Sequence, residues 1–442
     1  MKRVISLILS AVIISTLCIG CGNSSNSTNS SGTGKGNTTG VELRYSRWGL
    51  PEEMNGTKKM IEAFQKENPN IKVKLENSSW EEYWQKLQTQ IASNSAPDVF
   101  LLDAGWYLKQ FAPKGIIKDI TPLMEKDKVN KDQYYDVWKT FTYENKIFAM
   151  PRDINSLVLF YNKDLFKKAG ITEYPDGNMT WDELAKLAQK LTIDDKGRNA
   201  TDPDFDIKNA VQYGLHVNTP DTDALIETLI WQNGGKLMSE DGKECYLDKP
   251  EAREVLQYLH DLTWKYKVKL SPAAAQKYDQ NWLQTGKFAM VYQGSWMMST
   301  LSDATFDWDV TVPPNFGDKI YCVQSVGNAI MEKSKHQDEA WELVKFLSGK
   351  EGQTIMAEQN DAIPVLKDTA ENVYLKAEGK PANKKAIFDV SVKSVPYIDF
   401  PSKGEIFDSI KIKLEPYLNN QVDMDKAIQD ALDDVKRIQG KN

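Results

Sequence analysis

Hydrophobic positions along the chain alternate between two spacings, one typical of strands and one of helices. Val41–Gly49 alternates apolar and polar residues and predicts a strand, whereas Lys58–Glu67 has apolar residues at helical spacing. A second strand, a helix and a short buried strand follow at Ile71–Leu75, Tyr83–Ile91 and Val99–Leu102. Strands that alternate with helices predict an α/β fold with a parallel sheet.

The same alternation resumes after Pro151. Ser156–Tyr161 predicts a buried strand, and Asn162–Gly170 a short helix ended by glycine. Two capping boxes, Ser79-Trp-Glu-Glu82 and Thr180-Trp-Asp-Glu183, mark the starts of amphipathic helices. Further helices are predicted at Ala224–Trp231, Glu251–Tyr266, Glu339–Leu347 and Asp423–Ile438. The chain is therefore α/β throughout, with enough material for two lobes.

The first twenty residues have the pattern of a secretory signal peptide. Lys2 and Arg3 give a positive start, and the apolar run Val4–Leu17 is too short for a stable membrane-spanning helix. The stretch Leu17–Cys21 resembles a bacterial lipobox, although it has Cys18 where leucine is commonest. We therefore expect residues 1–20 to be removed and Cys21 to carry a lipid. The alternative is ordinary cleavage that leaves Cys21 as a spare thiol.

Residues 21–40 predict a flexible tether. From Gly22 to Gly40 nearly every residue is Gly, Ser, Thr or Asn, with a single Lys35. No later stretch is long and apolar enough to span a membrane. A lipid on Cys21 followed by this tether predicts an extracytoplasmic body anchored to the bacterial cell membrane.

Charge and cysteine content exclude several classes of protein. The 442 residues carry a net charge of −7, which becomes −9 when Lys2 and Arg3 leave with the signal peptide. An acidic chain is a poor partner for nucleic acid. Cys245 and Cys322 could form one disulfide, but two buried free thiols are favoured, and no pair of cysteines has metal-site spacing. We therefore predict no metal and no cofactor.

Seven segments, in order along the mature chain, resemble the extracellular solute-binding proteins of ABC-type sugar importers, the maltose-binding-protein-like group. Each segment by itself is weak evidence for this family. The combination is specific evidence, because the segments occur in the family's order and cover essentially all of the mature chain. The segments are Ala96–Val99, Ile147–Pro151, Leu159–Phe166, Thr180–Leu184, Trp282–Met290, Gln293–Trp296 and Ala340–Leu347.

The resemblance implies a two-lobed, periplasmic-binding-protein-like fold whose lobes are joined by hinge crossovers and close over a cleft. The crossovers would lie near Pro151–Asn155, Tyr321–Ser325 and Asp361–Leu366. Lobe 1 would combine 41–152 with 323–362, and lobe 2 would combine 153–322 with 363–442. The implied function is binding of a carbohydrate by a monomer that passes it to the permease subunits of an ABC importer.

Sugars offer apolar ring faces to aromatic side chains, so the twelve tryptophans are the first candidates for a site. Trp48, Trp106 and Trp231 stand where a strand or helix gives way to a loop, and the resembling family places an aromatic residue under the sugar at Trp296. For the other eight a core position is favoured, with Trp138 and Trp282 left undecided between core and site; the eight are Trp80, Trp84, Trp138, Trp181, Trp264, Trp282, Trp308 and Trp341.

Sugar hydroxyls need polar partners, and carboxylates suit them because a charged acceptor makes the stronger hydrogen bond. Asp103 follows a strand end, where it could instead cap a helix. Arg152 and Asp153 lie at the first crossover, where the resemblance implies a ligand contact and the alternative is an exposed ion pair. Further candidates are Ser295, Ser325, Asn328, Tyr397 and Phe400.

Three other functions are weighed. A glycoside hydrolase would need two carboxylates, such as Asp103 and Asp153, but no local motif marks either, and residue 297 is Met where a nucleophile elbow needs Gly. A calcium loop at Asp202–Asp206 lacks the glycine and glutamate of the EF-hand, which favours an acidic surface loop. Polyamine or peptide cargo on the same fold stays open, because acidic and aromatic residues also suit cations.

Overall fold

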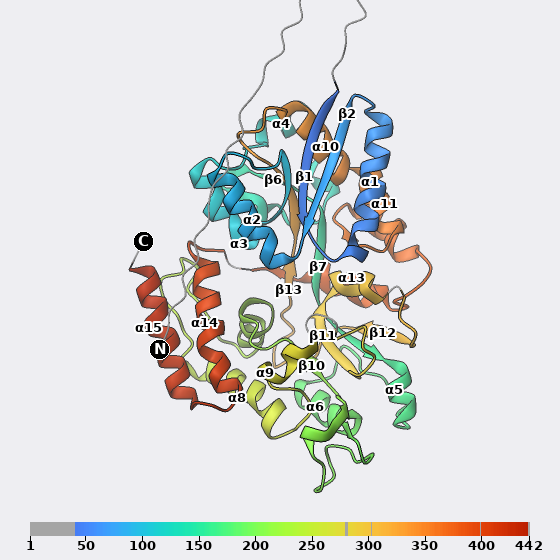
Figure 1. Ribbon diagram of the computed structural model, residues 1–442, viewed down its shortest axis with the longest axis vertical. Helices are drawn as coiled ribbons and strands as arrows, with labels where there is room; N and C mark the ends of the chain where they lie inside the picture. Colours follow the sequence, from blue (N-terminus) through green and yellow to red (C-terminus); the bar gives the residue numbers. More distant parts are fainter. Residues whose placement is uncertain (1–39, 279–281, 302, 398, 441–442) are drawn as a thin grey trace, which may run out of the picture. The chain divides into compact units, whose positions relative to one another are not determined.

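The computed structural model describes residues 40–278, 282–301, 303–397 and 399–440. The first of its two mixed β-sheets holds the strands nearest the amino terminus. Its strands are β1 (Val41–Trp48), β2 (Ile71–Ser78), β3 (Val99–Asp103), β6 (Ala149–Pro151) and β14 (Val326–Ile330). They lie in the order β2-β1-β3-β14-β6, and Figure 1 labels β2, β1 and β6 of this sheet. Strands β1, β2 and β3 run parallel, whereas β14 is antiparallel to β3 and β6.

The second sheet is built around a long central strand, β7 (Asp153–Asn162), in which all ten residues are buried. Its order is β10-β11-β7-β13-β16, with β12 and β15 also paired to β7. The remaining strands are β10 (His216–Val217), β11 (Met290–Gly294), β12 (Trp308–Thr311), β13 (Cys322–Gln324), β15 (Ile363–Pro364) and β16 (Val395–Pro396). Strands β11, β12, β13 and β15 are all antiparallel to β7.

Single residues connect the two sheets. Arg152 alone separates β6 from β7, and Ser325 alone separates β13 from β14. The prediction of a parallel sheet is therefore right for β1, β2 and β3 and wrong for β14, because β14 enters directly from the second sheet without a crossover helix. The predicted crossovers near residues 151–155 and 321–325 coincide with these passages between sheets.

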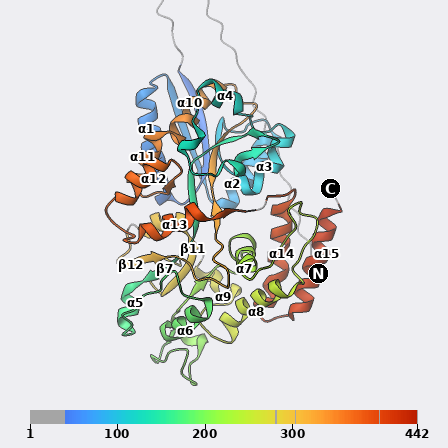
Figure 2. The ribbon, with the colours of Figure 1, turned by 180° about the vertical axis from the view of Figure 1, so that it is seen from behind.

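Helices cover both sheets, as Figures 1 and 2 show from opposite sides. Helices α1, α10 and α11 pack together beside the first sheet, α2 packs on β1 and β2, and α13 packs on β7. The helices are α1 (Met54–Glu67), α2 (Trp80–Ala92), α3 (Ala104–Phe111), α4 (Thr121–Lys126), α5 (Lys163–Lys168), α6 (Trp181–Leu191), α7 (Thr228–Gln232), α8 (Pro250–Trp264), α9 (Pro272–Ala275), α10 (Gln337–Ser348), α11 (Lys350–Glu358), α12 (Lys367–Asn372), α13 (Lys384–Lys393), α14 (Lys403–Leu418) and α15 (Met424–Gln439).

Two short antiparallel pairs complete the strands. They are β4 (Thr142–Tyr143) with β5 (Lys146–Ile147), and β8 (Ile193–Asp194) with β9 (Ala210–Gln212). The predicted signal peptide, the lipid-carrying Cys21 and the tether lie outside the described residues, apart from Gly40.

The predicted helix starts are confirmed where the chain carries a capping residue. Thr180 Oγ1 accepts a hydrogen bond from Glu183 N, and the Glu183 carboxylate accepts one from Thr180 N, so the second capping box is complete. Ser79 caps α2 by accepting from Glu82 N at 3.4 Å. These motifs are local, which is why the sequence alone reveals them.

Six of the eight tryptophans that we expected in the core are buried, and Trp80 is half-buried. Trp264 is the exception, because it is 42% exposed. It is the last residue of α8, beyond the apolar stripe that Leu259 and Leu262 carry into the core, and its Nε1 donates to the Leu418 carbonyl at 3.0 Å. The expectation of a core position for Trp264 is therefore wrong.

Candidate functional site

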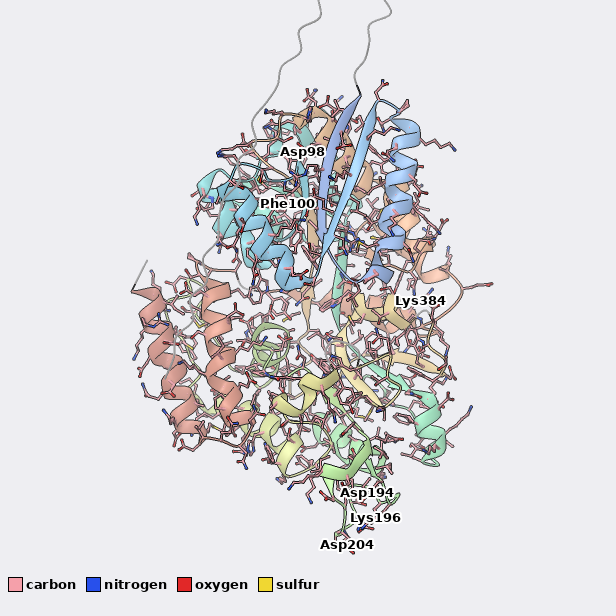
Figure 3. All side chains as sticks on the ribbon, viewed as in Figure 1. Asp98, Phe100, Asp194, Lys196, Asp204 and Lys384 are labelled. Atoms are coloured by element: carbon pink, nitrogen blue, oxygen red, sulfur yellow. The ribbon has the colours of Figure 1, made fainter. Side chains whose placement is uncertain are left out.

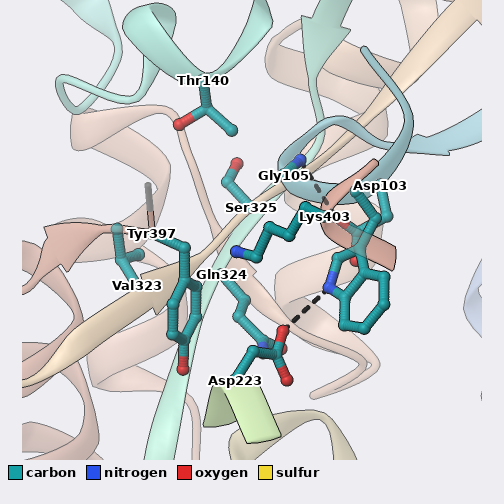
Figure 4. A pocket seen from close by; sticks show the side chains of 10 residues that line it. Asp103, Gly105, Thr140, Asp223, Val323, Gln324, Ser325, Tyr397 and Lys403 are labelled. Carbon is teal, nitrogen blue, oxygen red and sulfur yellow. Dashed lines mark hydrogen bonds between the residues drawn. The ribbon is translucent and has the colours of Figure 1, made fainter. Parts of the chain in front are cut away.

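A polar pocket lies where elements of the first sheet face elements of the second (Figure 4). The cavity has a volume of only about 20 Å³, which is room for about one water molecule. The first sheet contributes the end of β3 and the start of α3, and the second contributes β13, a π-helical turn labelled η6 (Thr222–Glu227) and the start of α14. The lining residues are Asp103, Gly105, Trp106, Thr140, Asp223, Val323, Gln324, Ser325, Tyr397 and Lys403.

Asp103 caps a helix, as one of the two interpretations from the sequence has it, and it also lines this pocket; its contact with a ligand stays a prediction. It ends β3, and its Oδ1 accepts a hydrogen bond from Gly105 N at 3.1 Å as the N-cap of α3. That cap sets the direction of α3, whose first turn carries Trp106. The Trp106 Nε1 donates to Asp223 Oδ2 at 2.8 Å, the bond drawn in Figure 4. A direct hydrogen bond therefore joins the two sides of the pocket.

Half-buried and buried carboxyl groups gather in and around the pocket. Burial, together with the charge of Asp223, raises the pKa of Asp103 to about 7 and the pKa of Asp221 to about 8. Burial likewise raises the pKa of Glu227 to about 8, and neither carboxylate oxygen of Glu227 has a hydrogen-bond partner within the described part of the chain. Groups held this far from their ordinary pKa values are typical of functional sites.

One buried ammonium group faces these carboxyl groups. Lys403, the first residue of α14, is 1% exposed and extends into the pocket (Figure 4). Its Nζ lies 5.0 Å from the ring centroids of Tyr397 and Phe407. The positive charge of Lys403 opposes the rise in the pKa values of Asp103 and Glu227. The pocket thus combines carboxylates, one ammonium group and aromatic faces.

Arg152 and Asp153 do not line the pocket. Both are buried, and the Arg152 guanidinium donates to Asp153 and to Asp361 Oδ2, the latter at 2.5 Å. Asp153 also accepts from Asn155 Nδ2 at 2.9 Å. The alternative of an exposed ion pair is wrong, because both side chains are buried. Ligand contact by either residue stays a prediction. They form a buried charge network at the passage from β6 to β7, whose third member, Asp361, lies beside the predicted third crossover.

Three more candidate side chains have their contacts inside the protein. Ser295 Oγ donates to Asn155 Oδ1 at 3.0 Å, and Asn328 Oδ1 accepts from the Tyr45 hydroxyl at 2.8 Å. Phe400 is 1% exposed and lies against Gly242, where a Cβ would stand 2.4 Å from the Phe400 ring. None of the three lines the pocket, because burial directs each side chain into the core.

The other candidates lie in or near the pocket. Ser325 and Tyr397 line it, and Ser325 Oγ donates to the Asp153 carbonyl at 2.6 Å. Trp231 is half-buried with its ring centroid 6.2 Å from that of Tyr397. Trp296 is half-buried against both hydrophobic cores, and its ring lies over Gly294. Trp231 and Trp296 do not themselves line the pocket.

Trp48 belongs to an aromatic cluster instead. Its ring centroid lies 5.0 Å from that of Trp80, 5.2 Å from that of Tyr83 and 5.5 Å from that of Trp84. Because the ring is half-buried and surrounded by other aromatic side chains, the structure gives Trp48 a packing contact outside the pocket.

Sequence reasoning missed Thr140, Asp223, Gln324 and Lys403. A sequence pattern could have drawn attention to Asp223. The residues Asp221-Thr-Asp223 directly precede the apolar run at Ala224, a pattern typical of a helix N-terminus. Lys403 follows Pro401 and Ser402 at the start of a helix that was not predicted. Gln324 lies within the predicted second crossover, Tyr321–Ser325, which was a signal that it could reach the site. Thr140 carried no signal, since it stands in an ordinary turn context.

No three His, Cys, Asp or Glu side chains within the described residues are placed to hold a metal ion. The Asp202–Asp206 loop is an exposed turn in which Asp202 Oδ1 accepts from Asp204 N at 2.9 Å, and Asp204 lies at the lower end of Figure 3. Cys245 and Cys322 are both free, as favoured, with Cys322 buried and Cys245 half-buried.

The described helices include none with the length and hydrophobicity to cross a membrane.

Comparison with known proteins places this geometry in a family. The model of the family described as "Bacterial extracellular solute-binding protein" matches residues 48–354. The arabinooligosaccharide-binding protein of Bacillus subtilis is 25% identical over 66% of this chain and 66% of its own. The maltotriose-binding protein of Pyrococcus abyssi is 23% identical over 74% of this chain and 67% of its own.

A solved structure resembles the whole described body. It is the ABC substrate-binding protein Lmo0181 from Listeria monocytogenes in complex with cycloalternan, with a TM-score of 0.81 and 28% identity over 91% of this chain and 99% of that one. The predicted α/β, two-lobed binding-protein fold is thereby confirmed. The chain belongs to the bacterial extracellular solute-binding proteins, a family of extracytoplasmic binding proteins and not of enzymes, as the sequence predicts.

Proposed function

We propose that this protein binds a carbohydrate, in particular an oligosaccharide, and delivers it to the permease subunits of an ABC importer. The observation that carries the proposal is a pocket between the two sheets in which aromatic faces, Trp106 and Tyr397, stand beside the carboxylates Asp103 and Asp223. Relatives named for arabinooligosaccharides and maltotriose, and a structural neighbour in complex with cycloalternan, support the same class of cargo.

The chemistry of the pocket suits a polyol. Hydroxyl groups donate to the carboxylates of Asp103 and Asp223, and the apolar face of a sugar ring packs on an aromatic side chain. The Trp106–Asp223 hydrogen bond now spans the space that a sugar would need. Entry of an oligosaccharide therefore requires this bond to separate, after which the sugar hydroxyls replace the indole N–H as donors to Asp223.

Closure is proposed as movement of two lobes, 41–152 with 323–362 against 153–322 with 363–442. The two sheets and the single-residue passages at Arg152 and Ser325 support this division. A ligand shifts such an equilibrium only by binding one state better than the other. In our proposal the closed state is favoured because only there can one sugar contact Asp103 and Asp223 together. Trp48, Trp231 and Trp296 are proposed as further contacts along a longer ligand.

Calorimetry on the purified mature chain tests the proposal. The panel is maltotriose, arabinotriose, mannotriose, a galactooligosaccharide and cycloalternan, with putrescine and a tripeptide as the competing cargo classes. We expect at least one carbohydrate to bind, and Asp223→Asn to weaken that binding about tenfold or more, because a hydrogen bond to a charged acceptor is lost. Asp204→Asn, in the exposed loop, is the matched control. Heat from putrescine or the peptide alone would overturn the proposal.

The lipid anchor is part of the same proposal. We infer from the lipobox-like Leu17–Cys21 that the mature chain begins at Cys21 and is held at the membrane by a lipid on its thiol. Mass spectrometry of the membrane fraction should find the acylated Cys21 peptide, and Cys21→Ala should leave an unacylated chain. An unmodified Cys21 in the wild type would contradict the anchor. A single monomer mass in light scattering tests the proposed oligomeric state.

A further inference from the structure

The position of Lys403 in the pocket is energetically unfavourable in three ways: for its charge, for the backbone before it and for its unpartnered ammonium group. As the first residue of α14 it places a positive charge at the positive end of the helix dipole. The residue before it, Ser402, has a φ of +61°, in the left-handed region that non-glycine residues seldom adopt. The ammonium group is buried, and among the described residues its Nζ has no hydrogen-bond partner. Conformations of this kind persist mainly at functional sites.

Carboxylates surround Lys403 without bonding to it. Its charge lowers the pKa values that burial raises at Asp103, Glu227 and Asp399, so all three lie within its field. A lysine retained only to neutralise buried carboxylates would be expected to form hydrogen-bonded ion pairs with them. Lys403 instead extends past them to the pocket, between the rings of Tyr397 and Phe407.

We propose that Lys403 is a ligand-contacting residue that makes this pocket selective for neutral sugars, by donating from Nζ to an oxygen of the bound carbohydrate. The carboxylates of the pocket would otherwise recruit a cation from the ligand, as expected for a polyamine or an amino sugar. Lys403 already occupies that place, so the cargo that fits is uncharged and offers an oxygen acceptor to Nζ and hydroxyl donors to the carboxylates. The inference rests on the proposed function and adds to it the charge of the cargo.

The test compares Lys403→Met, which keeps the length of the side chain, with Lys411→Met on the exposed face of the same helix. Each is titrated by calorimetry with whichever of maltotriose, arabinotriose, mannotriose, galactooligosaccharide or cycloalternan binds the wild type most tightly. We expect Lys403→Met to bind about tenfold or more weakly, as for a lost charge-assisted hydrogen bond, and Lys411→Met to bind within about twofold of the wild type. Equal loss in both variants would mean that overall charge acts and not contact, and would overturn the proposal.

A second measurement needs no variant, so it holds even if Lys403→Met does not fold. Putrescine at millimolar concentration should fail to displace the bound oligosaccharide from the wild type. Displacement by putrescine, or unchanged sugar affinity in a folded Lys403→Met, would overturn the role of Lys403 and leave carbohydrate binding standing. Absence of any carbohydrate binding to the wild type would instead overturn the proposed function itself.

Discussion

Replacing Glu227 with glutamine should change how the stability of the ligand-free protein depends on pH. The Glu227 side chain is fully buried, and burial raises its pKa from 4.5 to about 8. Between these values the folded state holds a proton that the unfolded state has released, so the free energy of unfolding falls as pH rises. Each pKa unit corresponds to about 1.4 kcal/mol, which gives a cost of about 1 kcal/mol near pH 5 and about 4 kcal/mol near pH 8.

Glutamine has the same shape and no titration, so its own burial cost is independent of pH. The free energy of unfolding of Glu227→Gln relative to the wild type should therefore rise by about 3 kcal/mol between about pH 5 and about pH 8. Urea unfolding followed by fluorescence at both pH values measures this difference. Glu62→Gln, on the exposed face of α1, is the control. If the wild type and Glu227→Gln changed in parallel over this range, the reasoning would be refuted.

Three further substitutions test other parts of the structure. Trp106→Phe keeps an aromatic ring but removes the N–H bound to Asp223, a bond that the sugar has to displace. It should therefore strengthen carbohydrate binding by about 1–2 kcal/mol in calorimetry, and weaker binding would contradict that displacement. Arg152→Met leaves two buried carboxylates unpaired and should lower the free energy of unfolding in urea by about 3–5 kcal/mol, whereas a loss under about 1 kcal/mol would contradict the buried network. Gly294→Ala would place a Cβ 2.1 Å from the Trp296 ring. The ring should therefore move, which changes the near-ultraviolet circular dichroism spectrum, and the fold should lose about 1–3 kcal/mol of stability. An unchanged spectrum would argue against the close packing.

Local signals in the sequence were sufficient for the elements of the fold that depend on neighbours along the chain. The Thr180 capping box and the apolar stripe that follows it predicted α6 correctly, because all the atoms involved lie within a few turns. The direction of β14 depends instead on where the chain returns from the second sheet, which no local pattern encodes. Helix α14 was missed although it is sixteen residues long, and Pro416 within it works against a helical prediction.

The candidate site shows the same limit. Asp103 and Trp106 were predicted because each follows a strand end, and the carboxyl ends of strands are where α/β sheets bind ligands. The buried pairing of Arg152 with Asp361 was not predicted, because the two residues are 209 positions apart along the chain. Lys403 enters the pocket through a helix start whose position depends on the packing of the whole second sheet.

The central strand β7 has a consequence for the order in which the protein folds. Its ten residues pair with four segments that follow much later in the sequence, the last of them at Ile363–Pro364, about 200 residues after Asn162. At a synthesis rate of about 5–20 residues per second, the last of those partners is made about 10–40 s after β7. Because contacts between distant segments also fold slowly, the second sheet stays incomplete throughout that interval. We propose that this chain is exported. A second sheet that is completed late would keep the chain unfolded long enough to cross the membrane.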